Sequence, residues 1–126
     1  NNDSLVFVKD GRIIFETDSP GIRGLLAAVE SASEGLKGSA AADRIVGEAA
    51  AQLFAYSKVV GVYADTLSRC GKDVLEKHGV DYQYSNLVPH ILNAKKTDLC
   101  PFEKIVSGSE SPQEAYERLK RSTTGS

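Results

Sequence analysis

The sequence contains no tryptophan and no methionine, and only two of its 126 residues are cysteine. Two widely separated cysteines do not make the disulfide framework of a small secreted domain, so we expect a reduced, cytoplasmic protein. No apolar run approaches the ~20 residues that a membrane-spanning helix needs. The first residues also lack the basic and then apolar pattern of a secretory signal. A membrane is therefore not an expected partner.

An excess of positive charge is missing as well. Fifteen basic residues stand against seventeen acidic ones, which gives a net charge of −2. Such a chain has no strong basic field, so nucleic acid is not an expected partner either. The 41% hydrophobic fraction is typical of a globular protein and predicts a single domain over 1–126. The segment from about 121 to 126 is polar and is expected to form a disordered tail.

What the sequence does contain begins with the stretch LVFVKDGRIIFE. Two β-branched or aromatic runs flank Asp10 and Gly11, a pair that tolerates the positive φ angles of a tight hairpin turn. This pattern predicts two antiparallel strands, Leu5–Val8 and Arg12–Glu16. Neither run alternates cleanly, which indicates a hairpin covered on both faces.

Helices and strands are then expected to alternate. Ser19 and Pro20 fit the start of a helix over 20–32. The stretch GSAAAD is interpreted as a short central strand. Asp43 then fits the cap of a helix over 44–56. A fully apolar strand over 58–65 precedes a helix over 67–78, capped by Thr66, with Cys70 among its inward-facing residues. VDYQYS is typical of an edge strand, and two helices follow near the C-terminus, the last opening with a Ser111–Glu114 capping box.

This order predicts the α/β class, with a mixed sheet that is parallel after the hairpin, sandwiched between helices in three α-β-α layers and followed by a helical C-terminal segment. In such sheets a ligand tends to bind beyond the carboxyl ends of the strands, near helix N-termini.

Several stretches carry a resemblance: VFVKDGRIIFE, SPGIRGLLAAVE, ADRIVGEAAA, VYADTLS and LCPFEK. Together they look like the cytidine-deaminase-like fold. More narrowly they resemble an uncharacterised family of small prokaryotic proteins with that fold, a domain of unknown function, over about Leu5 to Leu119. The resemblance implies the fold but no established activity.

Active zinc deaminases of this fold carry a His-or-Cys, any residue, Glu triplet at one helix start and Pro-Cys-x-x-Cys at the next, which together hold zinc and activate water. The corresponding helix starts here read Ser19-Pro20-Gly21-Ile22 and Ala42-Asp43-Arg44-Ile45-Val46. Neither offers the imidazole and thiolate ligands. The gaps among Cys70, His78, His90 and Cys100 are also unlike a structural zinc site. We therefore expect no metal, no cofactor and no zinc-dependent deamination.

Cys100 has two interpretations. It precedes Pro101 at a predicted helix start, where the helix dipole lowers a thiol pKa, and His90 lies ten positions upstream as a candidate base. Free cysteines are, however, among the most buried residue types, and Leu99 and Phe102 beside it are typical of a core.

Five residues near the helix starts are candidate ligand-binding residues: Arg23, Asp43, Arg44, Gly47 and Glu48. Arginines and helix N-termini suit phosphate, and an aspartate suits a ribose hydroxyl or a base amine. The alternatives are a plain helix cap for Asp43 and solvated charges for the arginines. No Walker or dinucleotide-type glycine loop is present.

Three functional classes remain open at this point. The first is a metal-free protein that binds a nucleotide-like ligand in the crevice. The second is a thiol-dependent enzyme that uses Cys100. The third is an interaction module, for which the edge strand and the resemblance both favour a homo-oligomer.

Overall fold

The computed structural model describes residues 5–18, 21–93 and 95–124. It opens with the predicted hairpin, formed by β1 (Leu5–Lys9) and β2 (Arg12–Thr17). Asp10 and Gly11 have φ angles of 54° and 76°. Two successive positive φ angles are what a type I′ turn requires, so the Asp-Gly signal for this hairpin is confirmed.

The remaining elements follow in the order α1 (Gly21–Ala32), a short 3₁₀ helix η1 (Ser33–Leu36), β3 (Ala40–Val46), α2 (Glu48–Ser57), β4 (Gly61–Ser68), α3 (Arg69–Lys77), β5 (Asp81–Val88), α4 (Pro101–Val106) and α5 (Pro112–Thr124). The strands form one sheet in the order β2-β1-β3-β4-β5. β1 is antiparallel to both of its neighbours, and β3, β4 and β5 are mutually parallel. The α/β class, the mixed sheet and the helical C-terminal segment are confirmed.

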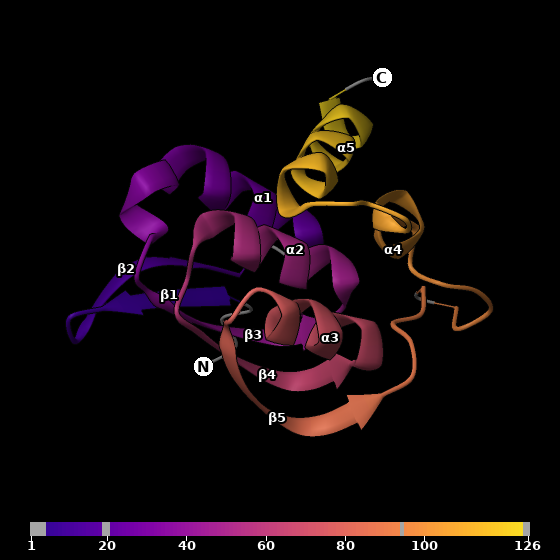
Figure 1. Cartoon of the computed structure of the whole chain (residues 1–126), viewed down its shortest axis with the longest axis horizontal. Coiled ribbons are helices and arrows are strands. Elements are labelled where there is room, and N and C mark those ends of the chain that lie inside the picture. Colours follow the sequence, from indigo (N-terminus) through magenta and orange to yellow (C-terminus); the bar gives the residue numbers. More distant parts are fainter. Residues whose placement is uncertain (1–4, 19–20, 94, 125–126) are drawn as a thin grey trace.

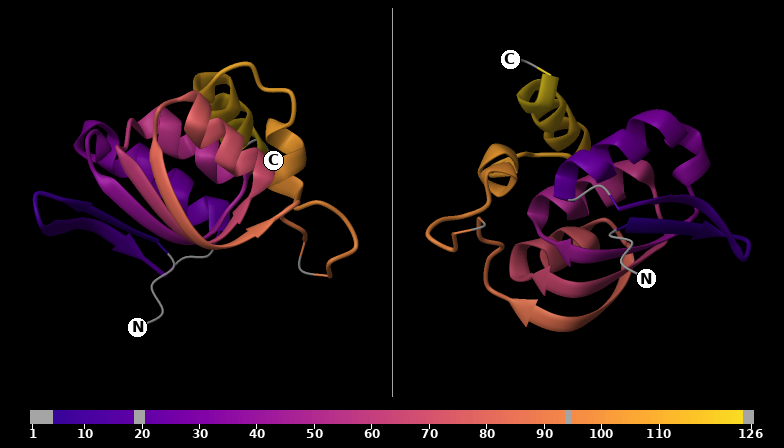
Figure 2. Two further views of the ribbon diagram at one scale, coloured as in Figure 1. Left: turned by 60° about the horizontal axis from the view of Figure 1, so that its bottom comes forward. Right: turned by 180° about the vertical axis from the view of Figure 1, so that it is seen from behind.

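The helices are layered differently from the predicted sandwich. α1, α2 and α3 lie side by side on one face of the sheet, and α4 and α5 pack on the outer side of α2 (Figure 1 and Figure 2). The connections β2–β3, β3–β4 and β4–β5 all step the same way across the sheet, and right-handed crossovers then put every helix on the same face. The layers are therefore sheet, helices, helices, and none of the residues described here forms a helix on the other face.

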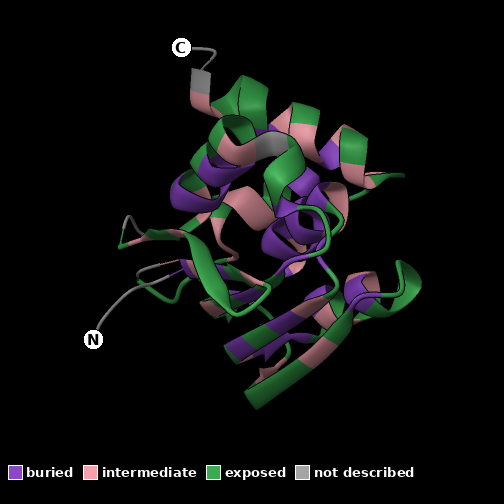
Figure 3. Cartoon of the chain, turned by 90° about the vertical axis from the view of Figure 1, so that its left-hand side faces the viewer, coloured by how far each residue is buried: buried purple, intermediate pink, exposed green. Residues whose placement is uncertain are grey.

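The core lies between the sheet and the helices. Buried residues gather there, and the hairpin is exposed along much of its length (Figure 3). Phe7 of β1 contacts Phe54 of α2, with ring centroids 6.0 Å apart. Ile13 is 58% exposed, so the expectation that both faces of the hairpin are covered was wrong.

Two helix starts lie later in the chain than expected. β3 extends to Val46 and α2 begins at Glu48, so Asp43 and Arg44 belong to a strand and Asp43 is not a helix cap. Ser68, rather than Thr66, caps α3 by accepting a hydrogen bond from the Gly71 N–H at 2.9 Å.

Two further predictions from the sequence were wrong, and one concerns residues that the structure does not describe. Cys70 is exposed rather than turned into the core. The tail expected from residue 121 is helical as far as Thr124. The proposed cap at Ser19 and Pro20 lies outside the described residues. No helix within those residues has the length and apolar character to cross a bilayer.

Candidate functional site

The carboxyl ends of the parallel strands meet the first turns of α2 and α3, where sequence reasoning placed the ligand. The residue before α2 is Gly47, which has no side chain to cap the helix. A carboxylate from a distant segment does so instead. Glu103 of α4 accepts hydrogen bonds from the Glu48 N–H through Oε1 and from the Ala49 N–H through Oε2, both at 2.8 Å. The two first amides of α2 thus have a fixed anionic partner.

Glycine is required at this junction by close packing. A Cβ on Gly47 would lie 2.4 Å from Glu103 Oε1 and 2.7 Å from Ile91 Cγ1. A Cβ on Gly71, at the start of α3, would lie 3.0 Å from the carbonyl carbon and oxygen of Gly47. Two glycines therefore allow α2, α3 and the segment before α4 to approach one another.

The charges around this junction are mostly negative. Burial and the neighbouring Glu103 raise the pKa of Glu48 above its ordinary value. Burial raises the pKa of Cys70 as well, helped by Glu48, Asp73 and Glu103. A raised pKa keeps the Cys70 thiol protonated, so this cysteine is a poor nucleophile at neutral pH.

Asp43 is the most perturbed acid of the region. It lies half-buried in β3, where its Oδ1 accepts a hydrogen bond from the Arg44 N–H at 2.8 Å. Burial raises its pKa from 3.8 to about 7, opposed by that hydrogen bond and assisted by the charge of Asp65. About half of the molecules therefore carry a neutral Asp43 at pH 7.

The structure joins only part of the predicted site. Gly47 and Glu48 meet at the start of α2, with Glu103 as their partner. Arg23 on α1 and Arg44 on β3 are exposed, and no side-chain contact is recorded between them and the other candidates within the described residues. Glu103 itself was missed, because its contact with Glu48 spans 55 positions and leaves no local signal.

Cys100 is half-buried and stands immediately before α4. Its N–H donates to the Ile91 carbonyl at 3.0 Å, and its own carbonyl accepts from the N–H groups of Glu103 and Lys104. These contacts use its backbone, so they place α4 without activating the thiol.

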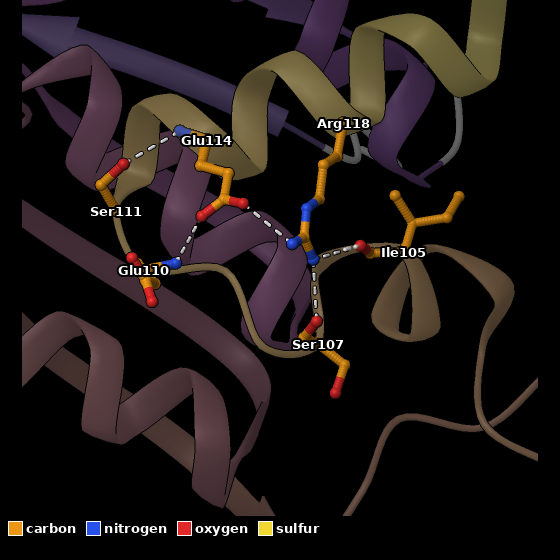
Figure 4. Close-up of polar contacts among 6 residues, drawn as sticks. All are labelled: Ile105, Ser107, Glu110, Ser111, Glu114 and Arg118. Atoms are coloured by element: carbon orange, nitrogen blue, oxygen red, sulfur yellow. Dashed lines mark hydrogen bonds and ion pairs between the residues drawn. The ribbon is translucent and has the colours of Figure 1, made fainter.

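At its C-terminal end, α4 is held by an arginine of α5 (Figure 4). Arg118 of α5 donates through Nη1 to the carbonyl oxygens of Ser107, at 2.9 Å, and Ile105, at 3.4 Å. Its Nη2 donates to Glu114 Oε2 at 2.8 Å, and Glu114 Oε1 accepts from the Glu110 N–H. The Glu114 N–H donates to Ser111 Oγ at 3.1 Å, which confirms the Ser111 half of the predicted capping box. The Glu114 carboxylate accepts from the Glu110 N–H instead of the Ser111 N–H. Arg118 thus ties the end of α4 to α5.

Two hollows lie away from these helix starts. One, of about 1120 Å³, lies between the C-terminal ends of α1 and α2 and the start of α5, where the rings of Tyr56 and Tyr116 stack 4.5 Å apart. The other, of about 740 Å³, lies at the amino ends of β3, β4 and β5. Glu103 and Ile91 fill the space at α2 that a ligand group would need.

A hairpin followed by three helix–strand units, with the strands in the sheet order β2-β1-β3-β4-β5 and polar groups at two helix starts, defines a protein of the deaminase-like α/β class. Comparison with known families then gives a narrower assignment. The model of a domain of unknown function, DUF1893, matches residues 1–122, and the chain belongs to this family.

Solved structures agree with this assignment. A crystal structure of the DUF1893 family protein TM1506 from Thermotoga maritima superposes with a TM-score of 0.87 at 27% identity, covering 95% of this chain and 80% of that one. The dCMP deaminase of cyanophage S-TIM5 gives a TM-score of 0.52 at 19% identity, over 65% of this chain and 79% of that one. Acinetobacter baumannii RibD gives 0.53 at 17% identity, over 67% and 28%. The last two show the fold alone, and no curated protein matches the chain.

The resemblance to deaminases implies a zinc ion at the starts of α1 and α2, and the residues present do not fit one. The first turn of α2 offers Gly47, Glu48 and Ala49, and both oxygens of Glu103 already accept backbone hydrogen bonds. Within the described residues no three His, Cys, Asp or Glu side chains form a cluster that could hold a metal ion. The amides of α2 are bound here by a carboxylate from the same chain.

Proposed function

We propose that this protein is a metal-free binding protein that holds a nucleotide-like ligand through Asp43 and does not carry out zinc-dependent deamination. The observation that carries the proposal is Asp43 itself, a half-buried carboxyl in the middle of the central strand β3, with its pKa raised to about 7. A neutral carboxylic acid offers a donor and an acceptor side by side. That pair matches the amide-like edge of a nucleobase, which presents the complementary pair.

The part of the ligand that Asp43 recognises is accordingly its base. The first amides of α2 are the ordinary phosphate position in such folds, and they support binding of a phosphate less well because Glu103 already occupies them. Arg23 of α1 is exposed on the helix side of the sheet and is the candidate partner for a ribose phosphate at the rim. Arg44 follows Asp43 in β3 and therefore points to the opposite face of the sheet. A nucleoside should therefore retain most of the affinity of its monophosphate.

The test is a thermal-shift and calorimetric titration of the full chain with the common nucleosides and their 5′-monophosphates at pH 6 and pH 8. At least one should stabilise the protein at pH 6. It should bind about tenfold more weakly at pH 8, where about a tenth of Asp43 stays protonated. Metal analysis of the same preparation should find no stoichiometric zinc.

Two variants sharpen this test. Asp43→Asn keeps a donor and an acceptor without a titratable proton, so its binding should not depend on pH between 6 and 8. Asp43→Leu removes both and should abolish binding. Asp10→Asn, in the exposed hairpin turn where asparagine also tolerates a positive φ, is the matched control and should bind like the natural chain. Stabilisation by none of the compounds, or full binding by Asp43→Leu, would contradict the proposal.

The alternative of a thiol enzyme has no specific observation in its favour. The contacts recorded for Cys100 are made by its backbone, and α4 is only six residues long. Cys100 should accordingly react with iodoacetamide no faster than a free thiol. The two free cysteines fit the cytoplasm, which we propose as its location.

A further inference from the structure

The strand β5 forms an open edge of the sheet (Figure 1). Asp81, its first residue, donates its N–H to the Val60 carbonyl at 3.1 Å, so the backbone groups of Asp81 face β4. Backbone groups alternate sides along a strand, and those of every second residue after Asp81 therefore face β4 as well. The other four residues turn their N–H and C=O groups to the open edge: Tyr82, Tyr84, Asn86 and Val88. Within the described residues no hydrogen bond is recorded for these edge groups.

This edge lacks the features that usually protect an edge strand from pairing. β5 pairs with β4 along its whole length without a register shift, and its sequence DYQYSNLV contains no proline, lysine or arginine. The strand at the opposite edge, β2, carries Arg12 and Glu16 and pairs with β1 through an irregular register. Proteins blunt exposed edges with charges, prolines and bulges, and an unprotected edge is a template for another strand.

The strand β5 is complementary to a second copy of itself. Two copies related by a two-fold axis run these strands antiparallel, and hydrogen-bonded pairs must join residues whose backbone groups face the edge. A register centred on Ser85 achieves this for all four edge residues. It places Tyr82 opposite Val88 of the second copy, and Tyr84 opposite Asn86, and each such pair exchanges two N–H···O bonds. A register centred on Tyr84 or on Asn86 would leave one edge residue of each copy without a partner in the strand.

The side chains of β5 suit the same register. Tyr82 and Tyr84 stack on the side of the helices, with ring centroids 6.3 Å apart. An aromatic residue opposite a β-branched one favours strand pairing, and Tyr82 opposite Val88 is such a pair. Asp81 is the only charged residue of β5, and the register places it opposite Pro89, so like charges do not meet. A second copy therefore fits this edge in backbone, length and charge.

The helices leave room for this arrangement. α3 packs against both β4 and β5. In a sheet continued across the edge, the two α3 helices would lie roughly two strand spacings, ~10 Å, apart. Packed helices commonly lie at about this distance, so α3 would meet its copy without a clash.

We propose that β5 is the interface of a homodimer, in which two copies pair their β5 strands antiparallel about a two-fold axis at Ser85 and form one continuous sheet. The proposal does not depend on the ligand of the preceding section. It gives the expected homo-oligomer a specific strand and a specific register.

The test is sedimentation velocity of the full chain from about 1 μM to about 500 μM, since an interface of one strand and its flanking side chains is small and predicts micromolar association. The 13.5 kDa chain should shift from monomer to dimer over this range. A natural chain that stays monomeric throughout would overturn the proposal.

Asn86→Pro blocks the edge and leaves the hydrogen bonds to β4 in place. The Asn86 N–H faces outward, where an edge strand tolerates proline, so the monomer should fold. The dimer should weaken about tenfold or more, because each copy loses a donor and its proline ring meets the other backbone. Circular dichroism checks that this variant and those below are folded.

Substitutions at Ser85 test the register. Ser85→Lys would place two ammonium groups opposite each other at the axis, and Ser85→Asp two carboxylates, so either variant alone should dimerise more weakly. An equimolar mixture of the two should restore association, because opposite charges then meet. Ala42→Lys, at an exposed position on β3 two strands away from β5, is the matched control and should dimerise like the natural chain.

Two results with these variants would contradict the proposal. A dimer that tolerates both Ser85 variants, or a mixture that associates no better than either variant alone, would show that the axis does not lie at Ser85. A dimer that is lost in Ala42→Lys and kept in Asn86→Pro would have its interface on the open face of the sheet instead of the β5 edge.

Discussion

At the scale of single residues, Asp43 shows how burial sets the chemistry of a side chain. Its pKa is raised from 3.8 to about 7, chiefly because burial disfavours the charged carboxylate. The folded state therefore binds the proton more tightly than the unfolded chain. This contribution to stability is complete below pH 3.8 and is lost as the pH rises through 7.

Asp43→Asn should consequently leave stability almost unchanged at pH 4 and raise it increasingly up to pH 7. Above that pH the gain should level off at up to about 4 kcal/mol, since each pKa unit corresponds to about 1.4 kcal/mol. Urea unfolding at pH 4, 6 and 8 measures this difference directly. A gain that is equal at all three pH values would show that ionisation of Asp43 is not its cause.

Close packing explains why position 47 is a glycine. Gly47→Ala would place a methyl group 2.4 Å from Glu103 Oε1 and 2.7 Å from Ile91 Cγ1, so the side chains of Glu103 and Ile91 must shift. Overpacking of this kind typically costs about 1 to 3 kcal/mol. The control is Gly35→Ala in η1, where a Cβ would meet nothing within 4 Å. Urea unfolding should separate the two variants, and equal stability of both would contradict the close contact.

At the scale of elements, local signals in the sequence were sufficient for some segments and insufficient for others. The Asp10–Gly11 turn and the Ser111 cap of α5 depend on neighbouring residues, and both are confirmed. The boundary between β3 and α2 was wrong because Ala40–Ala42 has a weak strand propensity and Asp43 is a good helix cap. The strand extends to Val46 because β3 pairs with β1 on one side and β4 on the other.

Only part of the candidate site could be predicted from local signals in the sequence. Asp43, Gly47 and Glu48 could be selected from the sequence because the fold brings helix starts to one end of the sheet. Glu103 and Arg118 could not be selected. Glu103 reaches α2 across 55 positions, and Arg118 acts on carbonyl groups of α4, which have no side-chain signature. Contacts between distant elements depend on the packing of α4 and α5, which a single sequence does not reveal.

The contact between α4 and α2 should be measurable as a cap. Glu103→Ala removes the acceptor for two amides of α2 and should cost about 1 to 3 kcal/mol, as the loss of charged hydrogen bonds and caps does. Amide exchange at Glu48 and Ala49 should accelerate at the same time. The pKa of Glu48 should fall, because the charge of Glu103 contributes to raising it.

Glu110→Ala is the control for this element, because Glu110 lies in the loop before α5, is exposed, and contributes its backbone N–H to Glu114. It should leave both the exchange of Glu48 and Ala49 and the pKa of Glu48 as they are. If Glu103→Ala changed stability but neither of these two readouts, its effect would lie outside the first turn of α2.

At the scale of the whole molecule, one core connects the two ends of the described chain. Leu5 of β1 and Leu119 of α5 belong to the same buried cluster, at 2% and 0% exposure. α4 and α5 both pack on α2, and α5 also contacts α1 through the hydrogen bond from Tyr116 to Glu30. The sheet, α2 and the C-terminal helices should therefore unfold in one cooperative transition, as small single domains usually do.

Leu119→Ala, in the outermost helix α5, tests whether the domain unfolds in one cooperative transition. Truncation of a fully buried leucine costs about 2 to 5 kcal/mol through lost burial and the cavity left behind. If the domain is one cooperative unit, the slowest-exchanging amides of β3 and β4 should lose that same free energy of protection, although they lie beneath α2 and not beside Leu119. Leu92→Ala, at a leucine that is 46% exposed, should change neither quantity appreciably. Weakened protection confined to α4 and α5 would mean instead that these helices open by themselves, and Glu103 would then leave the first turn of α2 without unfolding of the sheet.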